Sequence, residues 1–178
     1  LKGIVYPGAE TAAEIEEVAA LLADMEPRRG IATGTLQIIA LLDSGKGIWN
    51  IREIVKASSR VCSAGLDEMN LCRNMGIVPS SEFDPFVYAK GRIVIETRAA
   101  KVQPIGISHP YGVLPKFDDE DEIFQLALRG KNLGFAGVIC PDPSWVAQSN
   151  TAFAPPEDRL EFFRETRRLF TEGVARGT

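Results

Sequence analysis

The chain has 178 residues, of which 45% are hydrophobic and 25% charged, and this composition is typical of one water-soluble domain with its own core. Its 20 Lys and Arg residues and 24 Asp and Glu residues give a net charge of -4, so we expect no basic surface and no nucleic acid partner. No apolar run reaches the roughly 20 residues that span a bilayer, and the first residues follow a strand pattern rather than a signal peptide. We therefore expect a cytoplasmic protein without membrane contact.

Short apolar runs alternate with longer helical patterns along the chain, which predicts repeated βα units. The first predicted helix begins with a capping box at Thr11 and Glu14 and ends at Pro27. Each predicted strand is short, apolar and followed by Gly, Pro or a polar residue, and the five strands lie at residues 3–6, 36–42, 60–64, 102–107 and 134–140. The remaining helices are predicted at residues 48–57, 86–100, 121–133 and 157–174.

The pattern indicates one domain over residues 1–178, built as an open doubly wound sheet or as part of an eight-stranded barrel. A nucleotide-binding open sheet would carry a GxGxxG or Walker loop after an early strand, and residues 6–10 contain neither.

Three cysteines without CxxC spacing indicate neither a disulfide framework nor a zinc site. Trp49 and Tyr88 are interpreted as packing residues. The acidic run at residues 118–122 precedes a helix, which favours solvated, dipole-compensating charge over a metal-binding loop.

Two neighbouring predicted strands end in carboxylates. Asp43 follows the apolar run at residues 36–42, and Asp67 and Glu68 follow the run at residues 60–64. In parallel α/β folds the carboxyl ends of the strands face the ligand site, where a carboxylate can stay ionised beside an apolar core. This arrangement suggests a hard divalent cation, Mg²⁺ or Mn²⁺. Ser44 and Lys46 border Asp43 and are interpreted as turn residues or as contacts for an anionic substrate.

Six segments resemble, in order, those of the citrate lyase β-subunit and malyl-CoA lyase family within the HpcH/HpaI aldolase superfamily. Residues 43–54 resemble its segment I-E-T-A-x-G-V-x-N-A-x-E-I. Residues 3–10, 65–69 and 88–100 are similar to G-I-V-L-P-K-v-E, G-A-E-D-L and Y-A-R-S-R-V-V-L-A-A-R-A-A. Residues 133–141 and 150–157 are similar to L-G-F-D-G-K-x-I-H-P and N-x-x-F-x-P-S-x-E. The resemblance extends from Gly3 to about Arg168.

This resemblance implies a (β/α)8 barrel, of which the chain holds about the last five βα units, so we expect the complete protein to extend N-terminally by about three more units. Family members cleave or form a carbon-carbon bond next to a CoA thioester, and Mg²⁺ holds the keto-acid or hydroxy-acid part. The implied function is a magnesium-dependent lyase or aldolase acting on a small molecule, either an acyl-CoA of the citryl-, malyl- or citramalyl-CoA type or a related 2-keto or hydroxy acid.

The resemblance also implies site residues. Asp43 stands where the family has its metal-binding glutamate, and Glu68 stands where it has its metal-binding aspartate, with Asp67 as the alternative ligand. The catalytic candidates are Ser108, His109 and Cys140, although a surface loop residue is the alternative for His109. Ser108 replaces a position that is usually aspartate, and Cys140 replaces the histidine of I-H-P. Two other hypotheses therefore stay open: a non-catalytic or regulatory relative that keeps the barrel, and an unrelated open-sheet α/β binding protein.

The predicted helix at residues 157–174 presents Leu160, Phe163 and Phe170 on one apolar stripe. A stripe of this width is expected to pack on its own domain or on a neighbouring subunit. Together with the resemblance, it predicts a homo-oligomer, a trimer or a hexamer, with the helix at the subunit boundary.

Overall fold

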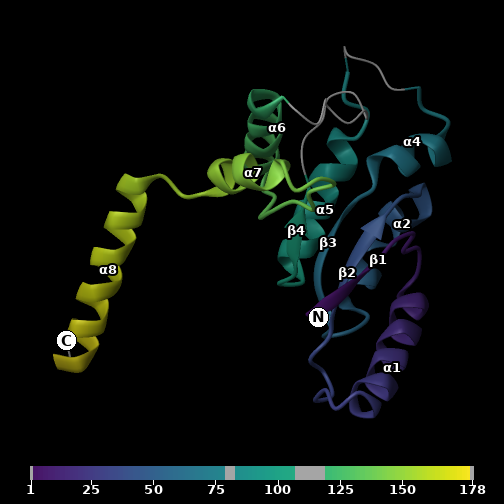
Figure 1. Cartoon of the computed structure of the whole chain (residues 1–178), viewed down its shortest axis with the longest axis horizontal. Coiled ribbons are helices and arrows are strands. Elements are labelled where there is room, and N and C mark those ends of the chain that lie inside the picture. Colours follow the sequence, from purple (N-terminus) through teal and green to yellow (C-terminus); the bar gives the residue numbers. More distant parts are fainter. Residues whose placement is uncertain (1, 79–82, 107–118, 177–178) are drawn as a thin grey trace.

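The computed structural model describes residues 2–78, 83–106 and 119–176. Its sheet contains four parallel strands in the order of the chain: β1 (Gly3–Tyr6), β2 (Gln37–Leu42), β3 (Val61–Leu66) and β4 (Gln103–Ile105). Helices connect successive strands (Figure 1). These strands agree with the first four predicted runs to within a few residues, and their parallel order confirms the predicted α/β class.

The fifth predicted strand, at residues 134–140, is wrong. Gly134 has a φ of 105° and caps the preceding helix, so the run begins in a helix end rather than in extended backbone. Among the described residues of this run, a single bridge joins Gly137 to Ile105. Two backbone hydrogen bonds accompany this bridge, from Ala136 N to Pro104 O at 2.8 Å and from Gly106 N to Gly137 O at 2.8 Å.

The helices are α1 (Ala12–Arg28), α2 (Gly45–Trp49), α3 (Ile51–Lys56), α4 (Glu68–Met75), α5 (Val87–Ala99), α6 (Glu120–Leu133), α7 (Trp145–Phe153) and α8 (Glu157–Arg176). The predicted capping box of α1 is present, and Pro27 lies inside the last turn rather than after it. The predicted helix at residues 48–57 is divided at Asn50 into α2 and α3. Asp119 caps α6 and three acidic residues fill its first turn, as the dipole argument predicts. Neither α4 nor α7 was predicted.

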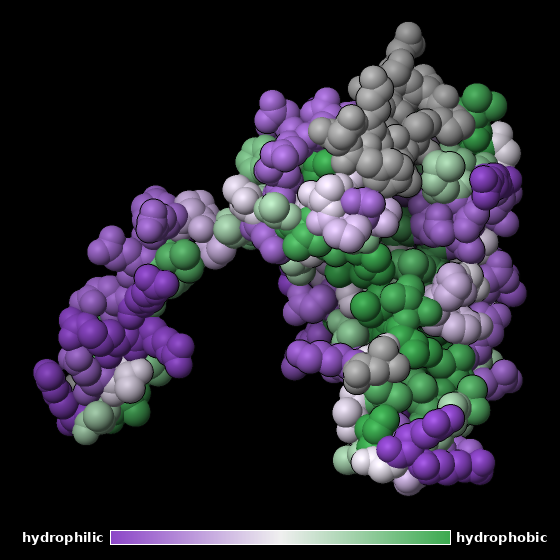
Figure 2. Space-filling view, viewed as in Figure 1, coloured by the Kyte–Doolittle hydropathy of each residue, from purple (hydrophilic) through white to green (hydrophobic). Residues whose placement is uncertain are grey.

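The core lies between the sheet and the helices that pack on one of its faces. Alternate residues of β2, Ile38, Ala40 and Leu42, are fully buried there, and Ile15 of α1 and Ile93 of α5 pack into the same cluster. The intervening strand positions are less covered: Ile39 and Leu41 are half-buried and Val5 is 46% exposed. Figure 2 shows the resulting apolar strip, which passes over β1 and β2.

Two packing predictions are wrong. Trp49 and Tyr88 are 71% and 72% exposed and lie on the outer surface of α2 and α5. The guanidinium of Arg92 lies over the Trp49 ring, 5.1 Å from its centre, and donates to the Trp49 backbone carbonyl at 2.7 Å.

Helix α8 stands apart from the body of the molecule (Figure 1). None of its residues is buried, so it does not pack on its own domain within the described residues. Its most exposed apolar side chains are Phe162, Phe163, Leu169, Phe170 and Val174.

Candidate functional site

The candidate site lies at the carboxyl ends of β1, β2 and β3. Asp43 directly follows β2, and Asp67 directly follows β3. Glu10 lies in the segment between β1 and α1. Because parallel strands end at the same edge of a sheet, three carboxylates from three consecutive strands gather at one end of the fold. This is the arrangement that the sequence predicts for Asp43 and the carboxylates after β3.

Asp43 is half-buried and surrounded by negative charge. Burial raises the pKa of its carboxyl, and the charges of Asp67 and Glu10 raise it further, against a lowering by its own backbone amide. Gly8, with a φ of 70°, faces this carboxylate, and a Cβ added at residue 8 would be in van der Waals contact with it, 3.5 Å from Asp43 Oδ2. A cation at Asp43 would offset this repulsion.

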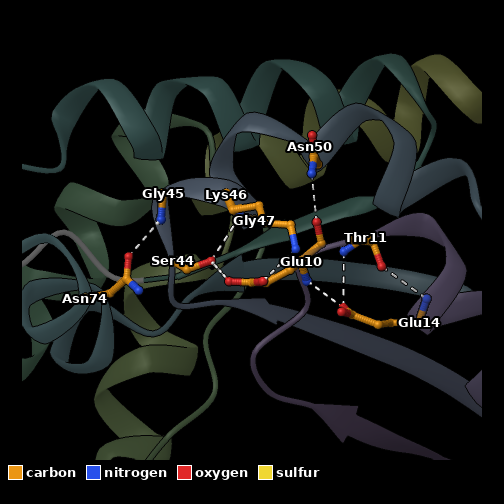
Figure 3. Close-up of polar contacts among 9 residues, drawn as sticks. All are labelled: Glu10, Thr11, Glu14, Ser44, Gly45, Lys46, Gly47, Asn50 and Asn74. Carbon is orange, nitrogen blue, oxygen red and sulfur yellow. Dashed lines mark hydrogen bonds and ion pairs between the residues drawn. The ribbon is translucent and has the colours of Figure 1, made fainter.

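Glu10 binds the turn that carries Asp43 (Figure 3). Its Oε1 accepts from Ser44 Oγ at 2.6 Å, and its Oε2 accepts from Lys46 Nζ at 3.0 Å. Asn50 Nδ2 donates to the Glu10 backbone carbonyl at 2.9 Å. The Ser44 and Lys46 hydrogen bonds lower the pKa of Glu10. Sequence reasoning missed Glu10, although its place shortly after β1 was a usable signal.

Glu68 points into the protein at the start of α4. Its Oε2 lies 3.2 Å from Lys90 Nζ, and Lys90 Nζ also donates to Asp84 Oδ2 at 2.8 Å. Lys90 is fully buried. Burial raises the pKa of Glu68 to about 7 even though Lys90 lowers it. The nearby charges that act on the pKa of Glu68 include those of Lys90, Asp84 and Asp67.

Asp67, the alternative ligand, caps α4. Its Oδ1 accepts from Asn70 N at 3.1 Å and its Oδ2 accepts from Asn70 Nδ2 at 2.9 Å. Asp67 is also the carboxylate whose charge acts most strongly on Asp43. The structure thus brings Asp43 together with Asp67 and Glu10, and brings Glu68 together with Lys90.

Of the three catalytic candidates, Cys140 is the one that lies in the described part of the chain. Ser108 and His109 lie outside the described residues. Cys140 is half-buried, and its thiol donates to Ser149 Oγ of α7 at 3.7 Å.

The donor set at the strand ends fits a magnesium ion. Within residues 2–78, 83–106 and 119–176, no three Asp, Glu, His or Cys side chains are close enough to enclose a metal by themselves. Mg²⁺ does not require such a cage, because it is commonly held by one or two carboxylates together with water and substrate oxygens. Asp43 and Asp67 offer hard oxygen donors of this kind at the ends of adjacent strands, and the charge of Asp67 acts on Asp43.

Comparison with known proteins identifies the family. The family described as HpcH/HpaI aldolase/citrate lyase matches residues 1–143. The chain belongs to this family. The citrate lyase subunit beta of Leuconostoc mesenteroides subsp. cremoris is 28% identical over 157 residues, which cover 88% of this chain and 50% of that protein. The L-malyl-CoA/beta-methylmalyl-CoA lyase of Cereibacter sphaeroides is 26% identical over 194 residues, which cover 99% of this chain and 59% of that protein. The chain spans about half the length of these family members.

Solved structures share the fold. A citrate lyase from Burkholderia xenovorans LB400 has a TM-score of 0.76 at 18% identity and covers 98% of this chain, with 55% of its own length matched. The protein CitE of Mycobacterium tuberculosis, in complex with magnesium and pyruvate, has a TM-score of 0.68 at 18% identity. The match covers 88% of this chain and 59% of CitE. The four-stranded sheet is part of a (β/α)8 barrel, which confirms the predicted architecture. In the described residues, no helix is long and apolar enough to cross a membrane.

Proposed function

We propose that this family member is part of a magnesium-dependent carbon-carbon lyase that acts on a short acyl-CoA thioester or on a related 2-keto or hydroxy acid. The observation that carries the proposal is the half-buried Asp43 at the end of β2, with a second carboxylate at the end of β3. The names of the relatives support this reaction class, since they are a citrate lyase subunit and an L-malyl-CoA lyase. CitE, which shares the fold, was solved with magnesium and pyruvate.

Asp43 is the proposed first ligand of the metal. Glu68 is the second ligand that the sequence predicts, and Asp67 is the alternative. The contacts support Asp67, because Glu68 would have to leave its ion pair with the buried Lys90 to reach a shared cation. Asp67 already interacts electrostatically with Asp43 and would lose only hydrogen bonds to Asn70.

The residues around Asp43 have separate roles in this proposal. Bound Mg²⁺ would stabilise the negative charge that develops on a substrate oxygen during carbon-carbon cleavage. Asp43 and its partner carboxylate orient the ion at the ends of the strands. Lys46 places a positive charge at the rim, three residues after Asp43, where an anionic substrate would approach. We expect the rest of the complete protein to supply further residues that bind the substrate.

Metal binding is the direct test, and it is made on the complete protein with Mn²⁺ as the probe, since free Mn²⁺ is measured by electron paramagnetic resonance. Asp43→Asn should weaken Mn²⁺ binding by roughly 10-fold or more, because one of two protein ligands is lost. Asp67→Asn should weaken it more than Glu68→Gln if Asp67 is the second ligand. The exposed Glu16 of α1 supplies the control, Glu16→Gln, which should bind as the wild type does.

The reaction is tested with citryl-, malyl- and citramalyl-CoA. Cleavage of one of them should require Mg²⁺, cease with a chelator and fall in Asp43→Asn. A protein that binds Mn²⁺ through Asp43 but cleaves neither the three thioesters nor the related 2-keto and hydroxy acids would instead be a non-catalytic relative. Unchanged Mn²⁺ affinity in Asp43→Asn would overturn the metal site itself.

We also propose a homo-oligomeric assembly, with α8 at the interface.

A further inference from the structure

The segment between β1 and α1 encloses the Asp43 turn from one side. Gly8 faces the Asp43 carboxylate, and Ala9 N donates to Leu41 O at 3.0 Å. Helix α2 rests on the same segment so tightly that a Cβ at Gly47 would lie 2.5 Å from Ala9 O. Backbone contacts therefore place residues 8–10 against the turn on both sides of Asp43.

Ser44 connects this segment to Asp43 most directly. It is the next residue after Asp43, it is buried, and its hydroxyl donates to Glu10 Oε1 at 2.6 Å. The same hydroxyl accepts from Gly47 N at 3.1 Å and so caps α2. A buried hydroxyl that donates to one group and accepts from another has a fixed orientation. The hydrogen bonds of Ser44 to Glu10 and Gly47 (Figure 3) therefore hold the backbone next to Asp43.

Lys46 provides a second connection from the same carboxylate. Its ammonium lies 3.0 Å from Glu10 Oε2, so the two oxygens of Glu10 bind two residues of the turn. This ion pair is partly exposed and contributes modestly by itself. Lys46 also compensates part of the charge of Glu10, one of the two carboxylates whose charges raise the pKa of Asp43.

We propose that Glu10 is a positioning residue for the metal site, acting through Ser44 and Lys46 to hold Asp43 in place without touching the metal itself. This inference rests on the proposed function, because it assumes that Asp43 binds the cation. It extends that function by assigning a role to the β1 end of the site. Outer residues that orient metal ligands typically change metal affinity by about 10–100-fold when they are removed.

The test compares Mn²⁺ affinity in variants of the complete protein. Glu10→Ala and Ser44→Ala should each raise the Mn²⁺ dissociation constant by roughly 10-fold. Glu10→Gln keeps an oxygen that accepts from Ser44 and loses the charge that pairs with Lys46, so it should recover most of the affinity. Glu16→Gln, the same change on an exposed glutamate, should have no effect. If Glu10→Ala fails to fold, Glu10→Asp, which withdraws the carboxylate by one methylene, should also weaken binding.

A double variant separates positioning from independent effects. If Glu10 acts through Ser44, the Glu10→Ala/Ser44→Ala protein should bind Mn²⁺ about as weakly as either single variant. If the affinity loss of the double variant equalled the product of the two single losses, Glu10 would not act through Ser44. A wild-type affinity in Glu10→Ala, in a series where Asp43→Asn loses binding, would overturn the positioning role alone. Unchanged binding in Asp43→Asn would overturn both this inference and the metal site on which it rests.

Discussion

At the residue scale, the ion pair between Glu26 and Arg60 joins three elements at the end of the barrel opposite to the candidate site. Arg60 donates to both Glu26 oxygens at 2.8 and 2.7 Å and to Leu36 O at 2.9 Å. The same carboxylate accepts from Gly34 N at 2.7 Å and from Leu36 N at 2.6 Å. Glu26 lies in α1, Leu36 directly precedes β2 and Arg60 directly precedes β3. Both side chains are buried, so a single carboxylate holds these chain segments together.

This pair predicts acid sensitivity. The hydrogen bonds from Arg60, followed by those of the two backbone amides, lower the pKa of Glu26 from 4.5 to about 2 despite its burial. Between pH 4.5 and about pH 2, Glu26 is therefore protonated in the unfolded chain but ionised in the folded protein. Its contribution to stability is present above pH 4.5 and is lost as the pH falls toward 2.

Melting temperatures of the complete protein between pH 6 and pH 2 measure this effect. Glu26→Gln should melt at a lower temperature near neutral pH, because Arg60 stays buried without its counter-charge. It should also lose less stability than the wild type on acidification. Parallel pH profiles for the two proteins would count against the assignment, and Glu16→Gln again provides the exposed control.

At the element scale, α2 contains two glycines with opposite surroundings. A Cβ at Gly47 would lie 2.5 Å from the backbone oxygen of Ala9, whereas a Cβ at Gly45 would have no heavy atom within 4 Å. Gly47→Ala should destabilise the complete protein by about 1–3 kcal/mol in urea denaturation, because backbone has to move. Gly45→Ala should be neutral or slightly stabilising, since it reduces the freedom of the unfolded chain. Equal stabilities for the two variants would contradict the close packing of Gly47 of α2 against the Ala9 backbone.

Elements whose signals lie between neighbouring residues could be predicted from the sequence. The apolar runs of β1, β2 and β3 and the capping box of α1 depend on neighbouring residues, and all of them were predicted. Short helices give few periods of an apolar pattern, and α4 and α7, of eight and nine residues, were missed.

Site contacts between distant residues were harder to predict. Asp43 was placed from its position after a strand, but the pairing of Glu68 with Lys90 joins residues 22 positions apart and depends on how α4 and α5 meet. One signal was present, because Lys90 lies on the same helix face as Phe86 and Ile93, where a buried charge needs a partner. The exposed positions of Trp49 and Tyr88 had no such local signal.

At the scale of the whole molecule, one face of the sheet is left partly uncovered. Val5, Ile39, Leu41 and Ile105 lie on the face opposite to the helices, and β1 and β4 are the two edge strands. In a closed barrel the apolar inner face is not exposed and no strand has a free edge. Since the chain spans about half the length of its relatives, we propose that the remaining strands of the complete barrel cover this face.

Helix α8 presents the second uncovered apolar surface. Its charged residues Glu165, Arg168, Glu172 and Arg176 form ion pairs with one another along one side. Leu160, Phe163, Phe170 and Val174 lie on the other side, whereas Phe162 and Leu169 flank the charged row. The rings of Phe162 and Phe163 meet edge to face near the start of the helix, with their centres 5.8 Å apart. A helix with ion pairs along one side and an exposed apolar side is organised for contact with another surface.

This surface predicts that α8 joins subunits of a homo-oligomer. Burying Phe163, Phe170 and Leu160 would contribute about 1.5–3 kcal/mol for each side chain, repeated at every interface of a symmetric assembly. Phe163→Asp should therefore convert the complete protein from an oligomer to a monomer in light scattering, with its circular dichroism unchanged. Glu161→Lys changes a charge on the side of the paired charged residues and should leave the assembly intact. A wild-type monomer, or an oligomer that survives Phe163→Asp, would assign the apolar side of α8 to the remainder of its own barrel instead.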